Sequence, residues 1–210
     1  MKIVVATRNN HKLTEFRRIL EPLGYEVVPQ EEVCPGIEVV EDGKTFSDNA
    51  KKKAMEIFKR VGIPSIADDS GLCVEALEGE PGVYSARYAG SPCNDEKNNQ
   101  KLLQNMSHIP KEMRGAYFAS TICCVLGAED IIICEGRCYG IIGYQPKGEN
   151  GFGYDPLFFV GEDGSVEPCS PDGLRSFAEL SAGEKDAISH RGVALRTLEQ
   201  EMKKREQSKK

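Results

Sequence analysis

Two adjacent acids, Asp68 and Asp69, follow the apolar pair Ile66-Ala67 and precede Ser70 and Gly71. Carboxylate oxygens are preferred ligands of Mg²⁺, which proteins usually hold with one or two carboxylates together with substrate phosphates. The pattern therefore suits phosphate chemistry that depends on a hard cation. A structural interpretation stays open, because an Asp-Asp-Ser-Gly segment can also cap a turn. In either case we expect the acids to stand at the end of a short strand.

A polar loop at residues 7–12 is a second candidate for binding phosphate. It consists of Thr7, Arg8, Asn9, Asn10, His11 and Lys12, between a predicted strand at 2–6 and a predicted helix. Free backbone N–H groups and the helix dipole attract phosphate at such a junction. Thr7, Asn9 and Lys12 would add a hydroxyl, an amide and an ammonium group. The loop lacks the Gly-x-x-x-x-Gly-Lys pattern of Walker-type loops, and an ordinary capped turn is the alternative.

Glu41 stands shortly before a helix whose start is predicted by the capping-box pattern Thr45-x-x-Asp48. Its carboxylate either complements the helix dipole or serves as a second metal ligand. The helix carries an apolar stripe, and we expect Lys51, Lys52 and Lys53 to lie mostly outside it.

The segment 148–158 concentrates glycine and aromatic residues. Its glycines let the backbone come close to a flat ligand, and Phe152 or Tyr154 can stack on such a ligand. Asp155 can accept a hydrogen bond from a donor edge. The alternative is a glycine-rich turn before an edge strand.

Cations gather near two predicted helix starts, Ser181-x-x-Glu184 and 189–192. Lys185, His190 and Arg191 would there oppose the helix dipole. This placement makes more sense if an anion binds among them.

The elements that must position these groups are strands and helices of ordinary length. We expect strands near 2–6, 25–28, 66–67, 116–122 and 131–134, and loops at 29–36 and 81–90. We expect helices near 13–20, 46–58 and 95–106, and two further helices that start at Ser181 and at Ser189, the last of them reaching Met202. In the first helix Phe16 and Leu20 should face inward, and Glu15 outward. The two neighbouring strands joined at 127–130 predict antiparallel pairing, which excludes a purely doubly wound fold.

The bulk properties fit one globular domain over residues 1–210, with 205–210 as a flexible tail. The chain has 40% apolar residues, eight cysteines and a net charge of -6. An acidic chain is a poor candidate for wrapping nucleic acid. The start of the chain has no signal-peptide pattern and no apolar run is long enough for a membrane span, so we expect a cytoplasmic protein with reduced thiols. Cys134 and Cys138 lack a second pair with zinc-ligand spacing.

Together the motifs resemble those of the non-canonical purine nucleoside triphosphate pyrophosphatases, the inosine triphosphate pyrophosphatase family. The matching segments are 7–12, 67–72, 81–90, 151–158, 177–180 and 188–192, in the family's order and over nearly the whole chain. Each is weak alone, but the six together are specific. The resemblance implies an α/β fold with an elongated mixed sheet, flanking helices and two lobes around a central nucleotide-binding cleft. It also implies a homodimer, Mg²⁺, and hydrolysis of ITP, dITP or XTP to the monophosphate and pyrophosphate.

By motif position, the resemblance implies that Glu41 and Asp69 bind the metal and that Asp69 is also the catalytic base. The positions that it implies for substrate binding are Thr7, Arg8, Asn9, Asn10, His11, Lys12, Ser70, Phe152, Gly153, Tyr154, Asp155, Lys185, His190 and Arg191. The chemistry is consistent, since pyrophosphate leaves the α-phosphorus with charge that a metal and several cations must neutralise. Choosing a 6-oxopurine without a 2-amino group requires a tight base pocket.

Two alternatives stay open. A Maf-type nucleotide pyrophosphatase would share the strand-loop-helix opening but prefer other bases, and the 151–156 and 189–192 motifs speak against it. A non-catalytic nucleotide sensor would not need Glu41, Asp69 and Lys12 together. One departure from the family pattern is the connection 161–176, which is longer and more polar than usual.

Overall fold

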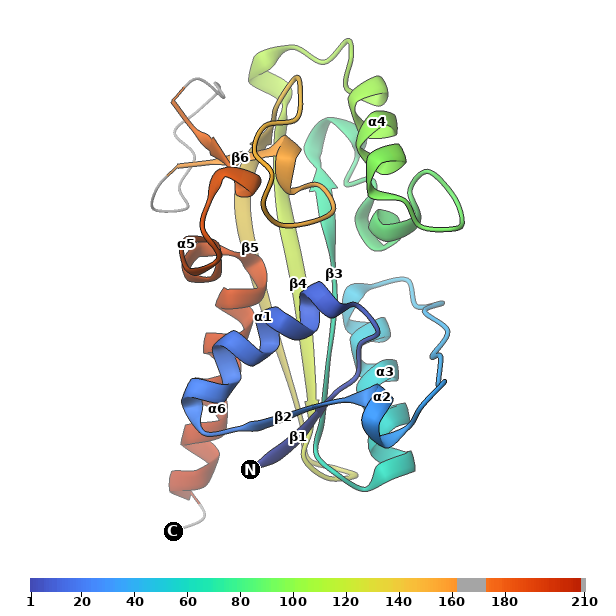
Figure 1. The fold of residues 1–210 in the computed structure, drawn as a ribbon, viewed down its shortest axis with the longest axis vertical. Helices are drawn as coiled ribbons and strands as arrows, with labels where there is room; N and C mark the ends of the chain where they lie inside the picture. Colours follow the sequence, from blue (N-terminus) through green and yellow to red (C-terminus); the bar gives the residue numbers. More distant parts are fainter. Residues whose placement is uncertain (162–172, 209–210) are drawn as a thin grey trace. The chain divides into compact units, whose positions relative to one another are not determined.

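The computed structural model describes residues 1–161 and 173–208 (Figure 1). Its strands are β1 (Lys2–Val5), β2 (Glu26–Pro29), β3 (Ser65–Val74), β4 (Gly115–Val125), β5 (Ile131–Ile142), β6 (Phe158–Val160) and β7 (Arg175–Ser176). Its α-helices are α1 (Asn10–Leu20), α2 (Gln30–Val33), α3 (Phe46–Val61), α4 (Asp95–Asn105), α5 (Ala182–Ile188) and α6 (His190–Ser208). Most of the unusual 161–176 connection lies outside the described residues.

The seven strands form one mixed sheet in the order β2-β1-β3-β4-β5-β6-β7. β1 is parallel to β2 and β3, whereas β6 is antiparallel to β5 and β7. β4 and β5 are neighbours joined by a turn at 126–130, and a connection that short permits only antiparallel pairing. The predicted α/β class, hairpin and mixed sheet are confirmed.

The chain forms two compact units. Unit 1 contains residues 1–69, 120–136 and 191–210, and unit 2 contains residues 70–119 and 137–190. β3, β4 and β5 each begin in one unit and end in the other. The single domain that we expected stays a prediction.

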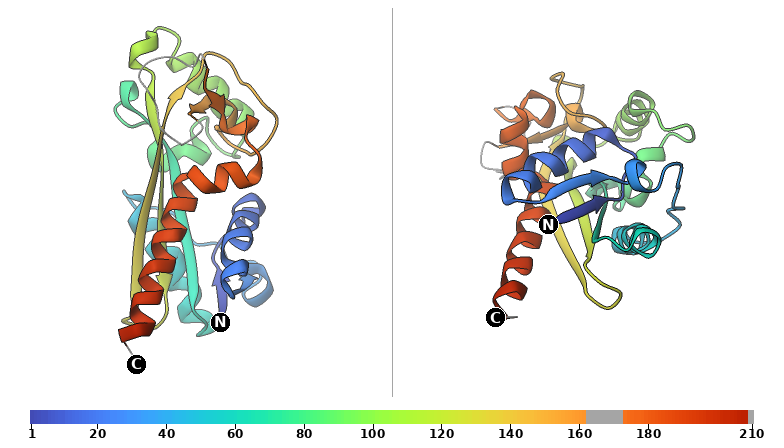
Figure 2. Two further views of the ribbon diagram at one scale, coloured as in Figure 1. Left: turned by 90° about the vertical axis from the view of Figure 1, so that its left-hand side faces the viewer. Right: turned by 60° about the horizontal axis from the view of Figure 1, so that its bottom comes forward.

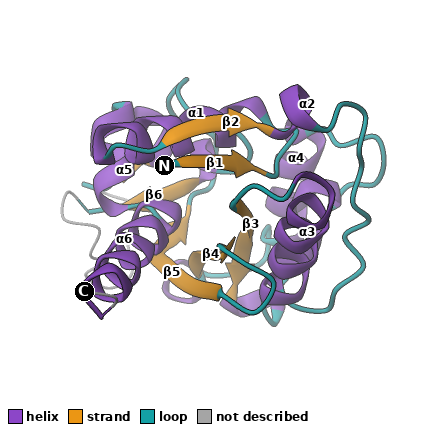
Figure 3. Cartoon of the chain, turned by 90° about the horizontal axis from the view of Figure 1, so that it is seen from below, coloured by secondary structure: helices purple, strands orange, loops and turns teal. Residues whose placement is uncertain are grey.

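In unit 1, helices cover both faces of the strands (Figure 3). Alternate strand residues separate the two layers, because successive side chains of a strand point to opposite faces. Ile3 and Val5 pack in the layer of α1 and α6 with Phe16 and Leu198, while Val4 packs in the layer of α3. Strands covered on both faces read as continuous apolar runs, which explains the sequence at 2–6.

β3 differs from the prediction. The acids were expected at a strand end, but β3 continues through Asp68 and Asp69 to Val74, and both carboxylates are buried. The strand tolerates them because each is paired with cations described below. An internal acid pair in a buried strand is costly without such partners.

Helix α3 begins as expected, whereas α1 begins at Asn10, three residues before the expected start near 13. Asn9 caps α1 by accepting a hydrogen bond from Lys12 N, and Thr45 caps α3 by accepting one from Asp48 N. The prediction that Glu15 and Lys53 lie on the solvent-facing sides of their helices was wrong. Glu15 of α1 is buried, and the Lys53 side chain of α3 is only 12% exposed. Both face charged partners that are distant in the sequence.

In unit 2, the core is rich in aromatic side chains. The rings of Phe118, Phe158 and Phe177 pack together, with centroids 4.7 Å apart for Phe118 and Phe158 and 4.9 Å for Phe158 and Phe177. Leu102 and Met106 of α4 belong to the same core. The predicted capping box at Ser181 and Glu184 opens α5.

Figure 2 shows α6 in dark red, with its C-terminal part near the turn between β4 and β5. Arg205 joins the two by donating to Asp130 Oδ1 and to the carbonyl of Ile131. Residues 205–208, expected in a flexible tail, are the end of this helix, and 209–210 lie outside the described residues.

Smaller differences concern loops and thiols. The predicted loop 29–36 contains α2, and 81–90 contains a 3₁₀ helix, Gly82–Arg87. The seven cysteines of the described part are free thiols, and Cys93 alone among these is exposed. No helix of the described residues combines the length and apolarity that crossing a membrane requires.

Candidate active site

The 7–12 loop of unit 1 is organised by short side-chain bonds. Asn9 N donates to Thr7 Oγ1 at 3.1 Å, and Lys12 N donates to Asn9 Oδ1 at 3.1 Å. These bonds fold the loop into the start of α1 and direct Lys12 toward β3, where its Nζ lies 3.2 Å from Asp68 Oδ1. Among residues 7–12, Lys12 is the one that the structure brings to the acids.

The other loop residues lie at the surface. Arg8 pairs with Glu38 at 3.3 Å between two exposed side chains. Asn10 and His11 are exposed in the first turn of α1, where the carbonyl of Asn10 accepts from Thr14. An exposed salt bridge contributes little, so Arg8 can exchange Glu38 for another anion at small cost.

Asp68 is fully buried against Arg191. The Arg191 Nε and Nη2 atoms both donate to Asp68 Oδ2, at 3.1 and 2.8 Å, and Nη1 donates to Glu15. Burial opposes the ionisation of Asp68, but Arg191, Lys12 and Lys53 hold its pKa well below the usual range. Asp68 is therefore an anion that fixes cations in place.

Lys12 and Arg191 respond to these neighbours in opposite ways. Burial lowers the pKa of Lys12, and the positive charges of Arg191 and Lys53 add to this effect while Asp68 opposes it. Burial also opposes the charge of Arg191, but Asp68 and Glu15 raise its pKa above the usual value. An additional anion near Lys12 would relieve the repulsion among the cations.

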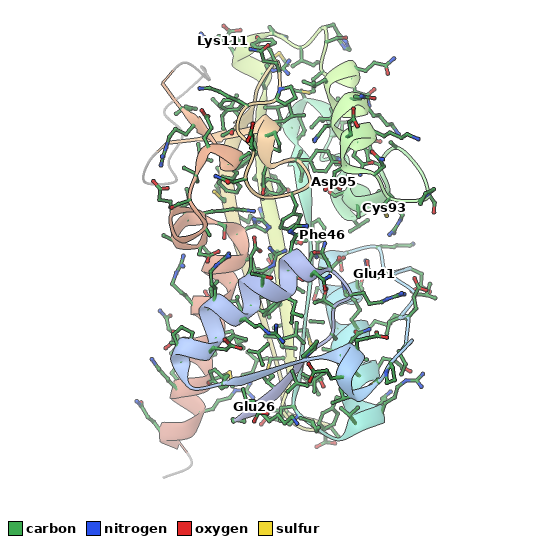
Figure 4. The ribbon with its side chains drawn as sticks, viewed as in Figure 1. Glu26, Glu41, Phe46, Cys93, Asp95 and Lys111 are labelled. Carbon is green, nitrogen blue, oxygen red and sulfur yellow. The ribbon has the colours of Figure 1, made fainter. Side chains whose placement is uncertain are left out.

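Asp69 and Glu41 meet at the ammonium group of Lys53. Lys53 Nζ lies 2.6 Å from Glu41 Oε1 and 3.6 Å from Asp69 Oδ1. Glu41, labelled in Figure 4, lies in the segment before α3, and its side chain is 33% exposed, so the group is open to water on this side. The two predicted metal ligands are thus brought to one cation.

The pKa values of this group reflect burial and pairing. Burial raises the pKa of Asp69, although Lys53, Lys12 and a hydrogen bond from Asn49 partly offset the effect. Burial opposes the charge of Lys53, but Asp69 and Glu41 raise its pKa. A carboxylate with a raised pKa is a stronger base, as an acceptor of a water proton needs to be.

The donor set fits a hard cation such as Mg²⁺. Two carboxylates converge on one positive charge, and Asp68 Oδ1 accepts no hydrogen bond of good geometry within the described residues. In the same residues no three acidic, histidine or cysteine side chains form a complete metal cage. Mg²⁺ commonly takes one or two carboxylates and leaves the remaining positions to water and substrate phosphate.

Unit 2 contains a second ion pair. Lys185 Nζ donates to Asp155 Oδ2 at 2.6 Å, and the same oxygen accepts from Phe152 N at 2.9 Å. Lys185 Nζ also lies 4.8 Å from the centre of the Phe152 ring, which is half-buried. Lys185 and Asp155 together fix the loop that carries Phe152, whose ring can stack on a flat ligand.

Gly151 makes this loop possible. Its φ is +77°, and an added Cβ would lie 2.0 Å from Asp155 Oδ2. Gly153, with φ +62°, is held by α4, because its N donates to Asp95 Oδ2 at 2.8 Å and its carbonyl accepts from Asn99 at 2.9 Å. The carboxylate of Asp155 and two residues of α4 therefore set the conformation of 151–155.

Two predicted substrate contacts of unit 2 are packed in its core. Tyr154 is buried and donates its hydroxyl to the carbonyl of Ser85 at 2.8 Å. The buried His190 ring stacks on Phe118 at 4.8 Å. Ser70, the first residue of unit 2, is half-buried. Of the aromatic residues suggested for stacking, Phe152 is the one placed at the edge of the core.

Three residues of unit 1 that organise the site were missed in the sequence. Glu15 and Lys53 were assigned to outer helix faces, and Asn49 was not considered. Asn49 donates to Asp69 Oδ2 at 2.9 Å. One signal in the sequence could have identified them: each is a charged or amide residue within the apolar stripe of α1 or α3. Burying such a residue is unfavourable unless it has a polar partner.

Comparison with known proteins identifies the chain's relatives. The sequence model of the Ham1 family matches residues 3–201. A dITP/XTP pyrophosphatase of Haemophilus influenzae is 48% identical over 204 residues, covering 96% of this chain and 98% of the relative. A dITP/XTP pyrophosphatase of Corynebacterium glutamicum is 49% identical over 204 residues, covering 94% and 95%.

A solved structure agrees in fold. The Ham1 protein of Staphylococcus aureus superposes with a TM-score of 0.83 at 37% identity, over 98% of this chain and 100% of that one. The resemblance drawn from the six motifs is confirmed.

Proposed function

The chain belongs to the Ham1 family, and from this we propose that it is a hydrolase that converts dITP, XTP and ITP to the monophosphate and pyrophosphate. Its relatives supply the substrate class. The observation that supports the chemistry is the group formed by Glu41, Lys53 and Asp69, beside Lys12 and the buried Asp68.

We assign the reaction at phosphorus to residues of unit 1. Asp69 orients a water molecule and accepts its proton as the water attacks the α-phosphorus. Lys12 binds the triphosphate by charge, and the positive end of the α1 helix dipole assists it. Asp68, with Arg191 and Glu15 behind it, keeps Lys12 directed toward the phosphates. General-base catalysis of this kind typically contributes 10²–10⁴-fold in rate.

We propose Mg²⁺ as the cofactor, and Glu41 and Asp69 are the residues that would hold it. When bound, it supplies neutralisation of the charge that develops on the departing pyrophosphate. Lys53, which lies beside both acids, would compete with the ion for the same carboxylates.

Recognition of the base is assigned to unit 2. Phe152 stacks on the purine, and Asp155 with Lys185 reads its polar edge. Discrimination against GTP and ATP requires that an exocyclic amine finds no room or no acceptor there. The half-buried Phe152 beside a buried ion pair supports this assignment.

The remaining parts of the proposal follow the family resemblance. We propose a cytoplasmic homodimer that removes damaged purine nucleotides from the nucleotide pool. Its net charge of -6 agrees with a small-molecule substrate rather than a nucleic acid partner.

One assay tests the function. The protein is incubated with Mg²⁺ and, separately, with XTP, dITP, ITP, GTP, ATP and pyrimidine triphosphates, and the products are separated by anion exchange. We expect monophosphate and pyrophosphate from the first three. Preference for pyrimidine or other bases would favour a Maf-type enzyme, and binding without turnover would favour a sensor. Release of orthophosphate without pyrophosphate would exclude attack at the α-phosphorus.

A further inference from the structure

Asn49, in the first turn of α3, connects two segments of unit 1 through one buried amide. Its Nδ2 donates to Asp69 Oδ2 at 2.9 Å, and its Oδ1 accepts from the backbone N of Gly43 at 2.8 Å. The residue is 1% exposed. Because Gly43 N can only donate and the Asp69 carboxylate accepts, the network fixes which side of the amide is oxygen.

Gly43 is adapted to this contact. An added Cβ would lie 2.6 Å from Asn49 Oδ1 and 2.7 Å from Asp48 Cβ. Gly43 is not one of the glycines with positive φ, so the requirement here is for space. The segment that carries Glu41 can therefore approach α3 closely enough to bond the amide.

We infer that Asn49 is a positioning residue that fixes the Asp69 carboxylate at a set distance from the Glu41 segment. The amide occupies Asp69 Oδ2, and Oδ1 is the oxygen that lies 3.6 Å from Lys53 Nζ, the cation shared with Glu41. The planar amide of Asn49 thus orients the Asp69 carboxylate and also holds the segment that carries Glu41. The kinetic consequence of this inference depends on the proposed function.

The test uses two substitutions that preserve the size of the side chain. Asn49→Leu removes both hydrogen bonds. Asn49→Asp keeps the acceptor for Gly43 but replaces the donor to Asp69 by an acceptor. With XTP and saturating Mg²⁺ we expect kcat to fall at least about tenfold in each variant, because a displaced catalytic group is costly. KM should stay within about threefold, since the substrate contacts are made by other residues.

A matched control exists in unit 2. Asn98 is 2% exposed and also bridges two backbone groups, accepting from Ala89 N at 2.7 Å and donating to the carbonyl of Ala86 at 3.0 Å. Asn98→Leu should lower the melting temperature as much as Asn49→Leu does. The affinity of Asn98→Leu for Mn²⁺, measured by electron paramagnetic resonance, should equal that of the parent. Asn49→Leu should bind Mn²⁺ about tenfold more weakly.

A crystal structure of Asn49→Leu completes the test, and we expect a changed Asp69 side-chain orientation. The inference is overturned if both Asn49 variants are folded with kcat within about twofold of the parent. It is also overturned if Asp69 and residues 41–43 are unmoved in the crystal structure and Mn²⁺ affinity is unchanged. If the parent itself releases no pyrophosphate from XTP, the proposed function fails, while Mn²⁺ affinity and the Asp69 orientation still test the role of Asn49.

Discussion

Arg191 donates two hydrogen bonds to a single oxygen of Asp68, from Nε at 3.1 Å and from Nη2 at 2.8 Å. The two residues are 123 positions apart, on α6 and β3, and both side chains are at most 2% exposed. A third partner, Glu15 of α1, accepts from Nη1. One guanidinium group therefore ties a strand of unit 1 to two of its helices.

Arg191→Met should destabilise the protein by about 3 kcal/mol or more, because it leaves Asp68 and Glu15 as buried acids without their cation. Urea unfolding followed by circular dichroism measures this. The control is Arg60→Met, since Arg60 pairs with Glu56 at 2.6 Å between partly exposed side chains of α3. That change should cost about 0.5 kcal/mol. Equal costs for the two variants would show that the Arg191 network contributes no more than a surface pair.

Asp69→Asn should give a folded protein whose turnover of XTP falls at least about a hundredfold. Asparagine keeps the shape and can still accept from Asn49, but it loses the charge and basicity that the reaction needs. Steady-state pyrophosphate release at saturating Mg²⁺ is the measurement. Asp42→Asn is the control, because Asp42 is an exposed acid in the same segment as Glu41 and pairs with Lys52 at 2.6 Å. Turnover of Asp69→Asn within about threefold of the parent would refute the role of Asp69.

Lys12→Ala should chiefly raise KM for XTP, by about tenfold or more, since a hydrogen bond to a charged group is worth about 1.5–3 kcal/mol. A point charge on phosphate acts in both the ground state and the transition state. Lys52→Ala controls for loss of a surface lysine, because Lys52 is 43% exposed. An unchanged KM in Lys12→Ala would argue against phosphate binding.

Local patterns in the sequence predicted the elements better than the site. Capping boxes and apolar periods gave α3, α5 and the β4–β5 hairpin, because these depend on residues a few positions apart. Glu15 was assigned outward because a charged residue in a helix is usually solvated. Its partner Arg191 lies 176 positions away, and no local period reports such a pair. Asp69 was singled out from its neighbours in the sequence, but its place inside a buried strand beside Lys53 and Asn49 was not predicted.

Gly151→Ala should raise KM for XTP and destabilise unit 2 beyond the cost of the backbone conformation. The added Cβ would lie 2.0 Å from Asp155 Oδ2 and displace the carboxylate that holds Phe152 N and Lys185. Gly79→Ala is the control, with φ +90° and nothing within 4 Å of its Cβ. It should show only the conformational cost, about 1–2 kcal/mol, with KM unchanged. If both alanine variants have the same KM for XTP, Asp155 takes no part in substrate binding.

Thiol labelling should distinguish Cys93 from the buried cysteines. Burial raises the pKa of Cys123 to about 11 and that of Cys138 to about 12, whereas Cys93 is exposed. The raised pKa keeps the Cys123 thiol protonated at pH 8, and the thiolate is the reactive form. Brief treatment with iodoacetamide followed by peptide mass spectrometry should label Cys93 and leave Cys123 and Cys138 unlabelled. Comparable labelling of Cys123 in the folded protein would contradict the packing of β4.

The division of the chain into units has a consequence for how the protein can vary in evolution. Unit 1 is assembled from three stretches of sequence and unit 2 from two, and the chain passes from one to the other after Asp69, Ala119, Gly136 and His190. At two of these four boundaries, Asp69 to Ser70 and His190 to Arg191, the residues on both sides are assigned to the site. A single recombination between two related genes can therefore never exchange a whole unit. Such a recombination would combine part of each unit's core with residues from the other gene. Substrate preference should therefore change by point substitution within 151–155 rather than by exchange of a whole unit.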